Sequence, residues 1–158
     1  MPNTVKPQMS STNAIEKQIF LRAPRARVWR ALTDAREFGT WFGVSLDDPL
    51  EVGKWASGRI THPGYEHVRF QMLVERMDLE VLFAYRWHPY AIDPDVDYSK
   101  EPMTLVEFRL EDAAGGTTLT LVESGFDQVP RDRRAEAFRM NEQGWTQQME
   151  NIRRHVET

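Results

Sequence analysis

The sequence predicts an α+β domain in which a curved antiparallel sheet of about six to seven strands packs around one long C-terminal helix. Two observations predict this fold. Apolar and polar residues alternate through much of 43–122, and an apolar stripe with helical spacing follows Pro130. The chain has 158 residues, which is the length of one domain and enough to bury a core.

The N-terminal part of this domain predicts a strand followed by two short helices. Apolar residues share one face of a strand over 15–21. Pro24 suits the first turn of a helix over 24–33. Asp34 is followed three positions later by a glutamate, which is the spacing of a capping box at the start of a second helix over 35–41.

The middle of the chain predicts an antiparallel meander, because its apolar residues repeat with a period of two and the turns between them are short. Residues 52–61 contain two glycines, which favours a bent or bulged pair of strands. The clearest alternating sets begin at Val68, Val81, Val106 and Thr117.

Residues 88–103 interrupt the alternation with a stretch rich in proline and acidic residues. A loop of this length inside a compact domain is expected to be a functional lid or a mobile insertion. After Pro130 no further proline occurs, and a helix is expected over roughly 130–156, about 40 Å long. Its apolar stripe is about 60° wide and consists of Phe138, Trp145, Met149, Ile152 and Val156.

Composition excludes several classes of function. The net charge is -4 and no basic cluster stands out, which argues against a nucleic-acid surface. Cysteine is absent, so disulfides, iron–sulfur clusters and thiolate zinc sites are excluded. No apolar run could span a bilayer. Residues 1–14 are polar and resemble no secretory signal, so we expect a disordered leader and a cytoplasmic protein.

The predicted order of strand, two short helices, meander and long helix is that of the helix-grip, or START-like, fold. The sequence resembles the SRPBCC superfamily and, within it, the branch related to the activator of the heat-shock-protein-90 ATPase. This likeness covers 15–157 as a single domain and is carried by Ala23-Pro24, Val28-Trp29, Ala31-Leu32, Thr33-Asp34, Trp41-Phe42, Glu123-Ser124-Gly125-Phe126-Asp127 and Gly144-Trp145.

The resemblance implies the fold more strongly than any chemistry, because none of these motifs is catalytic. In eukaryotes the family activates the chaperone with the help of a second, N-terminal domain. This chain has no room for such a domain, so chaperone activation is not expected. A protein-interaction role associated with chaperones stays open.

Aromatic and methionine side chains supply the candidate ligand-binding residues. Each of them is explained either by an ordinary core or by the wall of a cavity between the sheet and the C-terminal helix, and the sequence does not tell which strand face looks inward. Tryptophan and tyrosine would orient an apolar ligand through one polar atom, and methionine adapts its shape. The candidates are Trp41, Phe42, Phe70, Met72, Tyr85, Trp87, His88, Phe108, Phe126, Trp145 and Met149.

No catalytic residue, metal ligand or cofactor is assigned. The four histidines lack metal-binding spacing, and Ser124 lies outside a nucleophile motif. Glu107, Arg109 and Glu123 alternate with apolar residues and are expected to face solvent in cross-strand ion pairs. A carboxylate that entered the pocket instead would have a raised pKa and could serve as a base.

The sequence therefore favours a protein that binds a small apolar or amphipathic molecule, rather than a self-sufficient enzyme. A cyclase-like or hydrolase-like enzyme using the same cavity is one alternative, and a protein-interaction module is the other. The expected partner is a small apolar ligand, a protein partner stays open as the alternative, and the expected assembly is a monomer or a homodimer.

Overall fold

The computed structural model describes residues 12–158, and residues 1–11 of the predicted leader lie outside them. Seven strands form one antiparallel sheet in the order β1-β7-β6-β5-β4-β3-β2. The elements in chain order are β1 (Ala14–Leu21), α1 (Arg25–Thr33), α2 (Ala35–Phe42), β2 (Val44–Leu46), β3 (Trp55–Ile60), β4 (Arg69–Asp78), β5 (Leu82–Trp87), η1 (Tyr98–Lys100), β6 (Thr104–Ala113), β7 (Gly116–Ser124), η2 (Phe126–Gln128) and α3 (Arg131–Glu157). The predicted helix-grip fold is confirmed.

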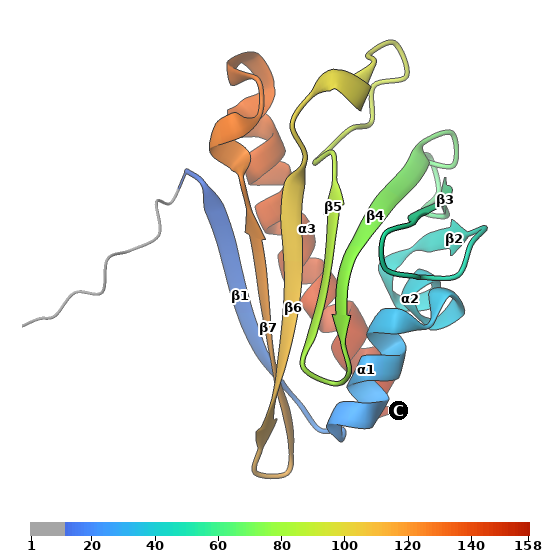
Figure 1. Cartoon of the computed structure of the whole chain (residues 1–158), viewed down its shortest axis with the longest axis vertical. Coiled ribbons are helices and arrows are strands. Elements are labelled where there is room, and N and C mark those ends of the chain that lie inside the picture. Colours follow the sequence, from blue (N-terminus) through green and yellow to red (C-terminus); the bar gives the residue numbers. More distant parts are fainter. Residues whose placement is uncertain (1–11) are drawn as a thin grey trace, which may run out of the picture.

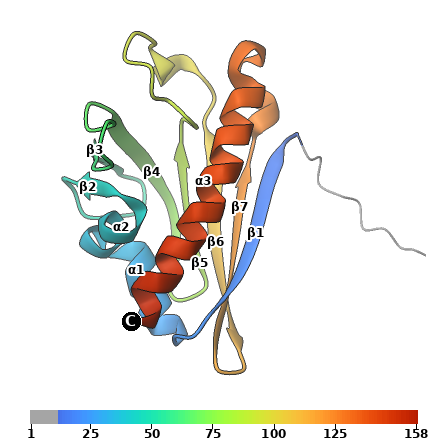
Figure 2. The same ribbon diagram turned by 180° about the vertical axis from the view of Figure 1, so that it is seen from behind.

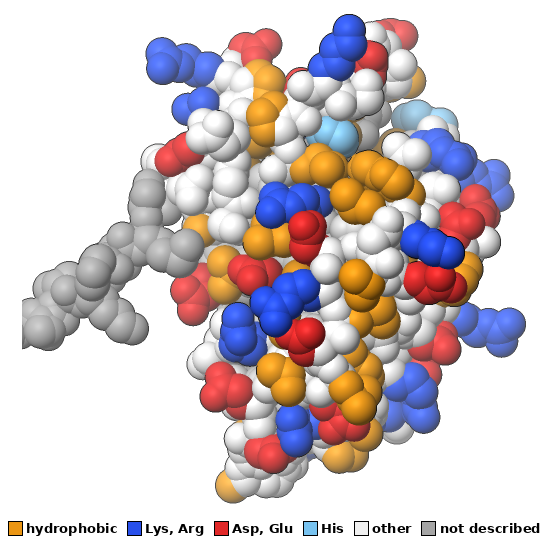
Figure 3. Space-filling view, viewed as in Figure 1, with side chains coloured by type: hydrophobic (Ala, Val, Ile, Leu, Met, Phe, Trp, Pro, Cys, Tyr) orange, Lys and Arg blue, Asp and Glu red, His pale blue; other side chains and the backbone are white. Residues whose placement is uncertain are grey.

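The sheet curves around α3, which crosses its inner face diagonally (Figures 1 and 2). The two short helices lie at the end of the sheet nearest the C-terminus of α3 (Figure 2). The outer face carries charged side chains of both signs among apolar ones (Figure 3). One layer of helix therefore covers one face of the sheet, and the core lies between them.

Strand β1 is held in the sheet by pairing with β7, a strand far from it in the sequence. Its residues pair with β7 from Ala14↔Ser124 to Leu21↔Thr117. Thr12 and Asn13 extend this contact, because Thr12 Oγ1 donates to Asp127 and the Asn13 carbonyl accepts from the connection after β7. The chain is thus held to the connection after β7 from two residues before β1 begins.

Helix α2 starts as its sequence predicts, since Asp34 accepts a hydrogen bond from the Glu37 amide at 3.0 Å. The predicted pair of strands within 52–61 is wrong. That stretch forms only β3, which lies between β4 and β2 and pairs with both of them. Gly58 permits the pairing with β2, because a Cβ there would lie 1.9 Å from the carbonyl oxygen of Ser45.

The long helix is anchored by its apolar stripe. Trp145, Met149, Ile152 and Val156 are buried, and the half-buried Phe138 packs edge-on against Phe126 with ring centroids 5.1 Å apart. Near its C-terminus, His155 contacts Glu37 at 2.9 Å. None of the helices within 12–158 is long and apolar enough to cross a membrane.

Candidate ligand-binding site

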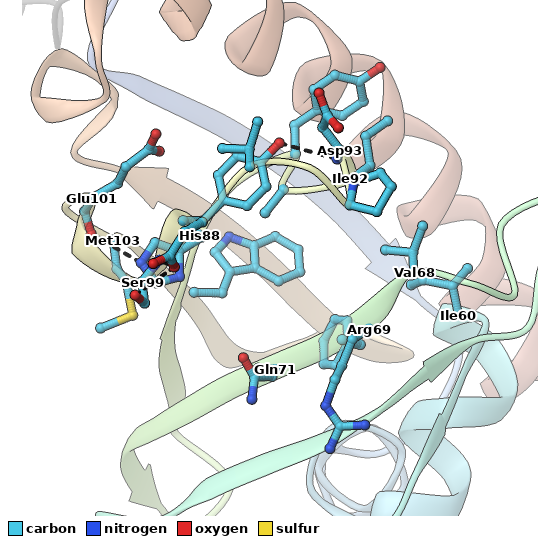
Figure 4. A pocket seen from close by; sticks show the side chains of 18 of the residues that line it. Ile60, Val68, Arg69, Gln71, His88, Ile92, Asp93, Ser99, Glu101 and Met103 are labelled. Carbon is cyan, nitrogen blue, oxygen red and sulfur yellow. Dashed lines mark hydrogen bonds between the residues drawn. The ribbon is translucent and has the colours of Figure 1, made fainter.

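A pocket of about 770 Å³ lies where β4 and β5 separate. Pairing between these strands begins only at Leu73↔Arg86, so the first residues of β4 have no partner on β5. Residues 88–103, which we call the lid, cover this gap as they run from β5 to β6. Figure 4 shows the pocket between Ile92 and Asp93 of the lid on one side and Val68, Arg69 and Gln71 on the other.

Three aromatic rings form the floor of the pocket, and we call them the aromatic floor. They are Phe42 at the end of α2, Phe70 on β4 and Trp87 at the end of β5. Their centroids lie 5.5 Å apart for Phe42 and Phe70, 5.9 Å for Phe42 and Trp87, and 5.8 Å for Phe70 and Trp87. Asn141 of α3 adds a polar group to the lining.

The lid is fastened to the start of α3 by one arginine. Arg133 Nε donates to Glu101 Oε1 at 2.9 Å, and Arg133 Nη1 donates to the carbonyl of Pro89 at 2.8 Å. The guanidinium also lies 4.7 Å from the centre of the Tyr98 ring. The base of the lid is closed by His88, whose Nε2 donates to the Glu101 carbonyl at 3.0 Å (Figure 4). Both arms of the lid are therefore anchored.

Glu123 lies behind the aromatic floor and is fully buried. The expectation that it faces solvent is wrong. Its Oε1 accepts from Trp145 Nε1 at 2.7 Å and from Asn141 Nδ2 at 3.0 Å. Its Oε2 accepts from Thr104 Oγ1 at 2.6 Å, from Trp87 Nε1 at 2.8 Å and from Asn141 Nδ2 at 3.2 Å. One carboxylate thus joins β5, β6, β7 and α3.

Burial raises the pKa of the Glu123 carboxyl, and the hydrogen bonds from Thr104, Trp145, Trp87 and Asn141 oppose that rise. These partners approach through donor atoms, which is the arrangement that complements an ionised carboxylate. Each carboxylate oxygen already has at least two donors. A reaction that used Glu123 as a base would first require one of these donors to leave.

Tyr85 is a second buried polar group near this carboxylate. Its hydroxyl has no hydrogen-bond partner among residues 12–158. Burial raises the pKa of Tyr85 well above its ordinary value, and the negative charge of Glu123 raises it further. The phenol is therefore a neutral group at neutral pH, packed edge-on against Trp87 at 5.3 Å between centroids.

The pocket lining includes Phe42, Phe70, Trp87 and His88 of the eleven candidates predicted from sequence. The other seven do not line it and are buried, and they are Trp41, Met72, Tyr85, Phe108, Phe126, Trp145 and Met149. Trp41 donates its indole N–H to the Ala31 carbonyl. Phe126 follows the end of β7 and packs against Phe138 of α3.

Sequence reasoning missed one polar residue of this region, Asn141, and placed another, Glu123, on the surface. Glu123 continues the alternation of Leu119 and Leu121 along β7, and that shared face was the available signal. Asn141 lies on α3 four positions before Trp145, so it falls on the same face of the helix. Neither position by itself signals a polar partner, because the partners come from other elements.

A second, open groove continues from the pocket along α3. It shares Phe42, Ile60, Val68 and Ile92 with the pocket and is bordered by Gly144. A Cβ at Gly144 would meet no atom within 4 Å. The pocket therefore opens toward solvent along the side of the helix.

Residues 22–157 match the family described as activator of Hsp90 ATPase homolog 1-like protein. The chain belongs to this family. The match spans both short helices, the sheet from β2 onward and all of α3. A comparison with curated proteins found no match.

Solved structures of low sequence identity share the fold. DynU16, from the dynemicin biosynthetic locus, is 23% identical with a TM-score of 0.71. The superposition covers 92% of this chain and 48% of DynU16. The chain therefore spans about half of DynU16. MLL2253 from Mesorhizobium loti is 22% identical with a TM-score of 0.71, covering 90% and 96% of the two chains. The Aha1 dimer from Colwellia psychrerythraea is 15% identical with a TM-score of 0.66, covering 91% and 96%.

Proposed function

We propose that this protein binds a small, largely apolar molecule in the pocket beneath the lid. The observation that carries the proposal is the aromatic floor of Phe42, Phe70 and Trp87 beside the amide of Asn141. Ligand pockets are typically apolar cavities of about 300–1,000 Å³ with a few polar groups that orient the ligand. The pocket under the lid has this size and this kind of lining.

The expected affinity follows from the apolar surface that a ligand would bury. About 200 Å² of apolar surface contributes roughly 5 kcal/mol at about 25 cal/mol per Å². Loss of translational and rotational freedom offsets part of this gain, which leaves a micromolar to millimolar affinity. The origin of DynU16 in a biosynthetic locus agrees with a small-molecule ligand for this fold.

Catalysis in the same pocket is the second candidate function, and one observation favours it. Glu123 is a buried carboxylate whose pKa is raised, and such groups are common at active sites. Its oxygens are saturated by donors and it has no exposed surface. We therefore place Glu123 behind the binding surface, as a residue that positions Trp87 and Asn141.

A thermal-shift screen of aromatic, sterol, polyketide-like and fatty compounds tests the proposal, with mass analysis of each hit after incubation. Ala91 lines the pocket from the lid, and Ala91→Trp should fill the space and abolish the shift. Ala114→Trp is the matched control, because Ala114 is exposed in the β6–β7 turn and does not line the pocket.

A reproducible shift, lost in the lid variant but kept in the control, with the compound recovered unchanged, would support binding. Chemical conversion of a hit would favour the enzyme. An absence of any stabilising compound would contradict the proposal and leave the protein-interaction alternative standing.

A further inference from the structure

The charge of Glu123 is the starting point for asking what kind of ligand the pocket selects. None of the ion pairs formed within residues 12–158 includes Glu123. The carboxylate is held by neutral donors, which stabilise its charge but do not cancel it. A buried charge without a counterion is costly to maintain, and its field extends into the low-dielectric surroundings. One residue of the aromatic floor, Trp87, is hydrogen-bonded to it.

Trp87 connects the charged carboxylate to the pocket, because it contacts Glu123 and also lines the pocket. Its indole N–H points away from the pocket and donates to Glu123 Oε2 at 2.8 Å, while the side chain forms part of the lining. An indole that donates to a carboxylate has its ring polarised so that the π face becomes more negative. Tryptophan already gives the strongest attraction of a cation to an aromatic face. The floor is therefore suited to a cationic group resting on it.

Asn141 presents a hydrogen-bond acceptor to the same space. Its Nδ2 is committed to both oxygens of Glu123, which fixes the orientation of the amide because a carboxylate requires donors. No donor within the described chain hydrogen-bonds to Asn141 Oδ1, although Asn141 lines the pocket. The amide oxygen is thus available to a ligand that brings its own N–H or O–H.

The charged residues of the lining are three carboxylates and one arginine, and one of the carboxylates, Glu101, is paired with Arg133. Asp93, Asp97 and Glu101 of the lid carry carboxylates. Arg69 is the arginine of the lining, but its guanidinium points away from the lid and donates to Ser57 on the neighbouring strand (Figure 4). A carboxylate on a ligand would meet an electron-rich ring, an acceptor oxygen and a buried negative charge.

We infer that the pocket selects apolar molecules whose polar end is a protonated amine, and discriminates against those that end in a carboxylate. This inference rests on the proposed function and names the ligand class for the same pocket. Glu123 acts as a positioning residue in it, because it turns the Asn141 amide and polarises Trp87 without touching the ligand.

Tryptamine and indole-3-propionate form a matched pair of probes, since they share the indole ring and a two-carbon chain and differ in the sign of the terminal charge. Their dissociation constants are measured by titration calorimetry or by NMR, at low and at moderate salt. We expect tryptamine to bind on the order of tenfold more tightly, which corresponds to one ordinary charge or cation–π interaction in a partly desolvated site. The difference should shrink as salt is added.

Variants separate the sources of this preference. Asn141→Leu removes the acceptor and should reduce the preference to about threefold or less, since one hydrogen bond to a cation is lost. Gln143→Leu is the matched control on the same helix, because Gln143 is exposed and lines neither this pocket nor the groove that continues from it. Glu123→Gln keeps the shape and removes the charge, and it should also reduce the preference; its folding is checked by a thermal melt.

A clear preference for tryptamine, reduced in Asn141→Leu and kept in Gln143→Leu, supports the inference. Equal binding of both probes, or tighter binding of indole-3-propionate, overturns it while leaving the proposed function intact. If neither probe binds and the compound screen yields only acids or uncharged molecules, the inference is again overturned. If no compound of any class binds, the proposed function fails with it.

Discussion

Trp145 is the side chain whose replacement should show most directly how α3 is held on the sheet. It is 2% exposed, and its ring lies 5.7 to 6.0 Å from those of Phe42, Trp87 and Phe108. Removing the side chain with Trp145→Ala costs about 3–5 kcal/mol for the lost packing and the cavity. Loss of the 2.7 Å hydrogen bond to Glu123 adds about 1.5–3 kcal/mol. The sum approaches the whole stability of a typical domain.

Trp145→Phe separates the two contributions, because it keeps much of the aromatic surface and removes the N–H. We expect it to lower the free energy of unfolding by about 1.5–3 kcal/mol, as measured by urea denaturation. Trp55→Phe is the control, since Trp55 is 48% exposed and its replacement should cost little. If Trp145→Phe lowers the free energy of unfolding by less than about 0.5 kcal/mol, the hydrogen bond to the buried carboxylate does not stabilise the packing of α3 on the sheet.

Three further predictions concern the two ends of the helix and its middle. Burial raises the pKa of Glu37, but the hydrogen bond from His155 and those from two arginines outweigh it and hold the pKa at about 2, below its ordinary value of 4.5. This stabilisation, at most about 3 kcal/mol and less because the site is partly exposed, is present above pH 4.5 and is lost as the pH falls toward 2. Urea melts from pH 6 to 3 should therefore show a shallower acid loss in Glu37→Gln, and identical slopes would contradict the assignment. Gly144→Ala should raise stability by about 0.5–1 kcal/mol in the same melts, because a helix favours alanine and the added carbon meets nothing; destabilisation would mean that the position is crowded. Arg133→Met should speed amide hydrogen exchange in the lid, whereas Arg131→Met at the exposed neighbouring position should not, and equal protection in both variants would mean that the arginine does not fasten the lid.

The fold was predictable because its two periodic signals are local and strong. The alternation along β6 and β7 and the stripe on α3 each come from residues close together in sequence. The pattern within each element therefore predicts which of its faces is buried. The pair of strands expected within 52–61 failed for a physical reason. Strand β2 has three residues, too short for any pattern, and its place is set by the close approach that Gly58 permits.

The candidate site was harder to predict because its polar centre is built from distant positions. A glutamate is ordinarily assigned to the surface, since burying its charge is costly. What offsets that cost here is the convergence of Trp87, Thr104, Asn141 and Trp145, which lie up to 36 residues away along the chain. The sequence likewise does not distinguish an aromatic residue of the pocket floor from one of the hydrophobic core. Phe70 lines the pocket while Phe108 does not, although both alternate along strands in the same way.

The pairing of β1 with β7 also governs how the protein must be made. Gln18 and Thr120, cross-strand neighbours with a side-chain hydrogen bond, are 102 residues apart. On the ribosome β1 therefore stays unpaired until β7 has been made, and the inner face with Tyr85 and Phe108 stays uncovered until α3 has emerged as well. A domain with such long-range pairing folds slowly, and until folding is complete the nascent sheet exposes an aromatic surface that is prone to aggregation. Helix α3, which follows β7 in the chain, is the element that shields it.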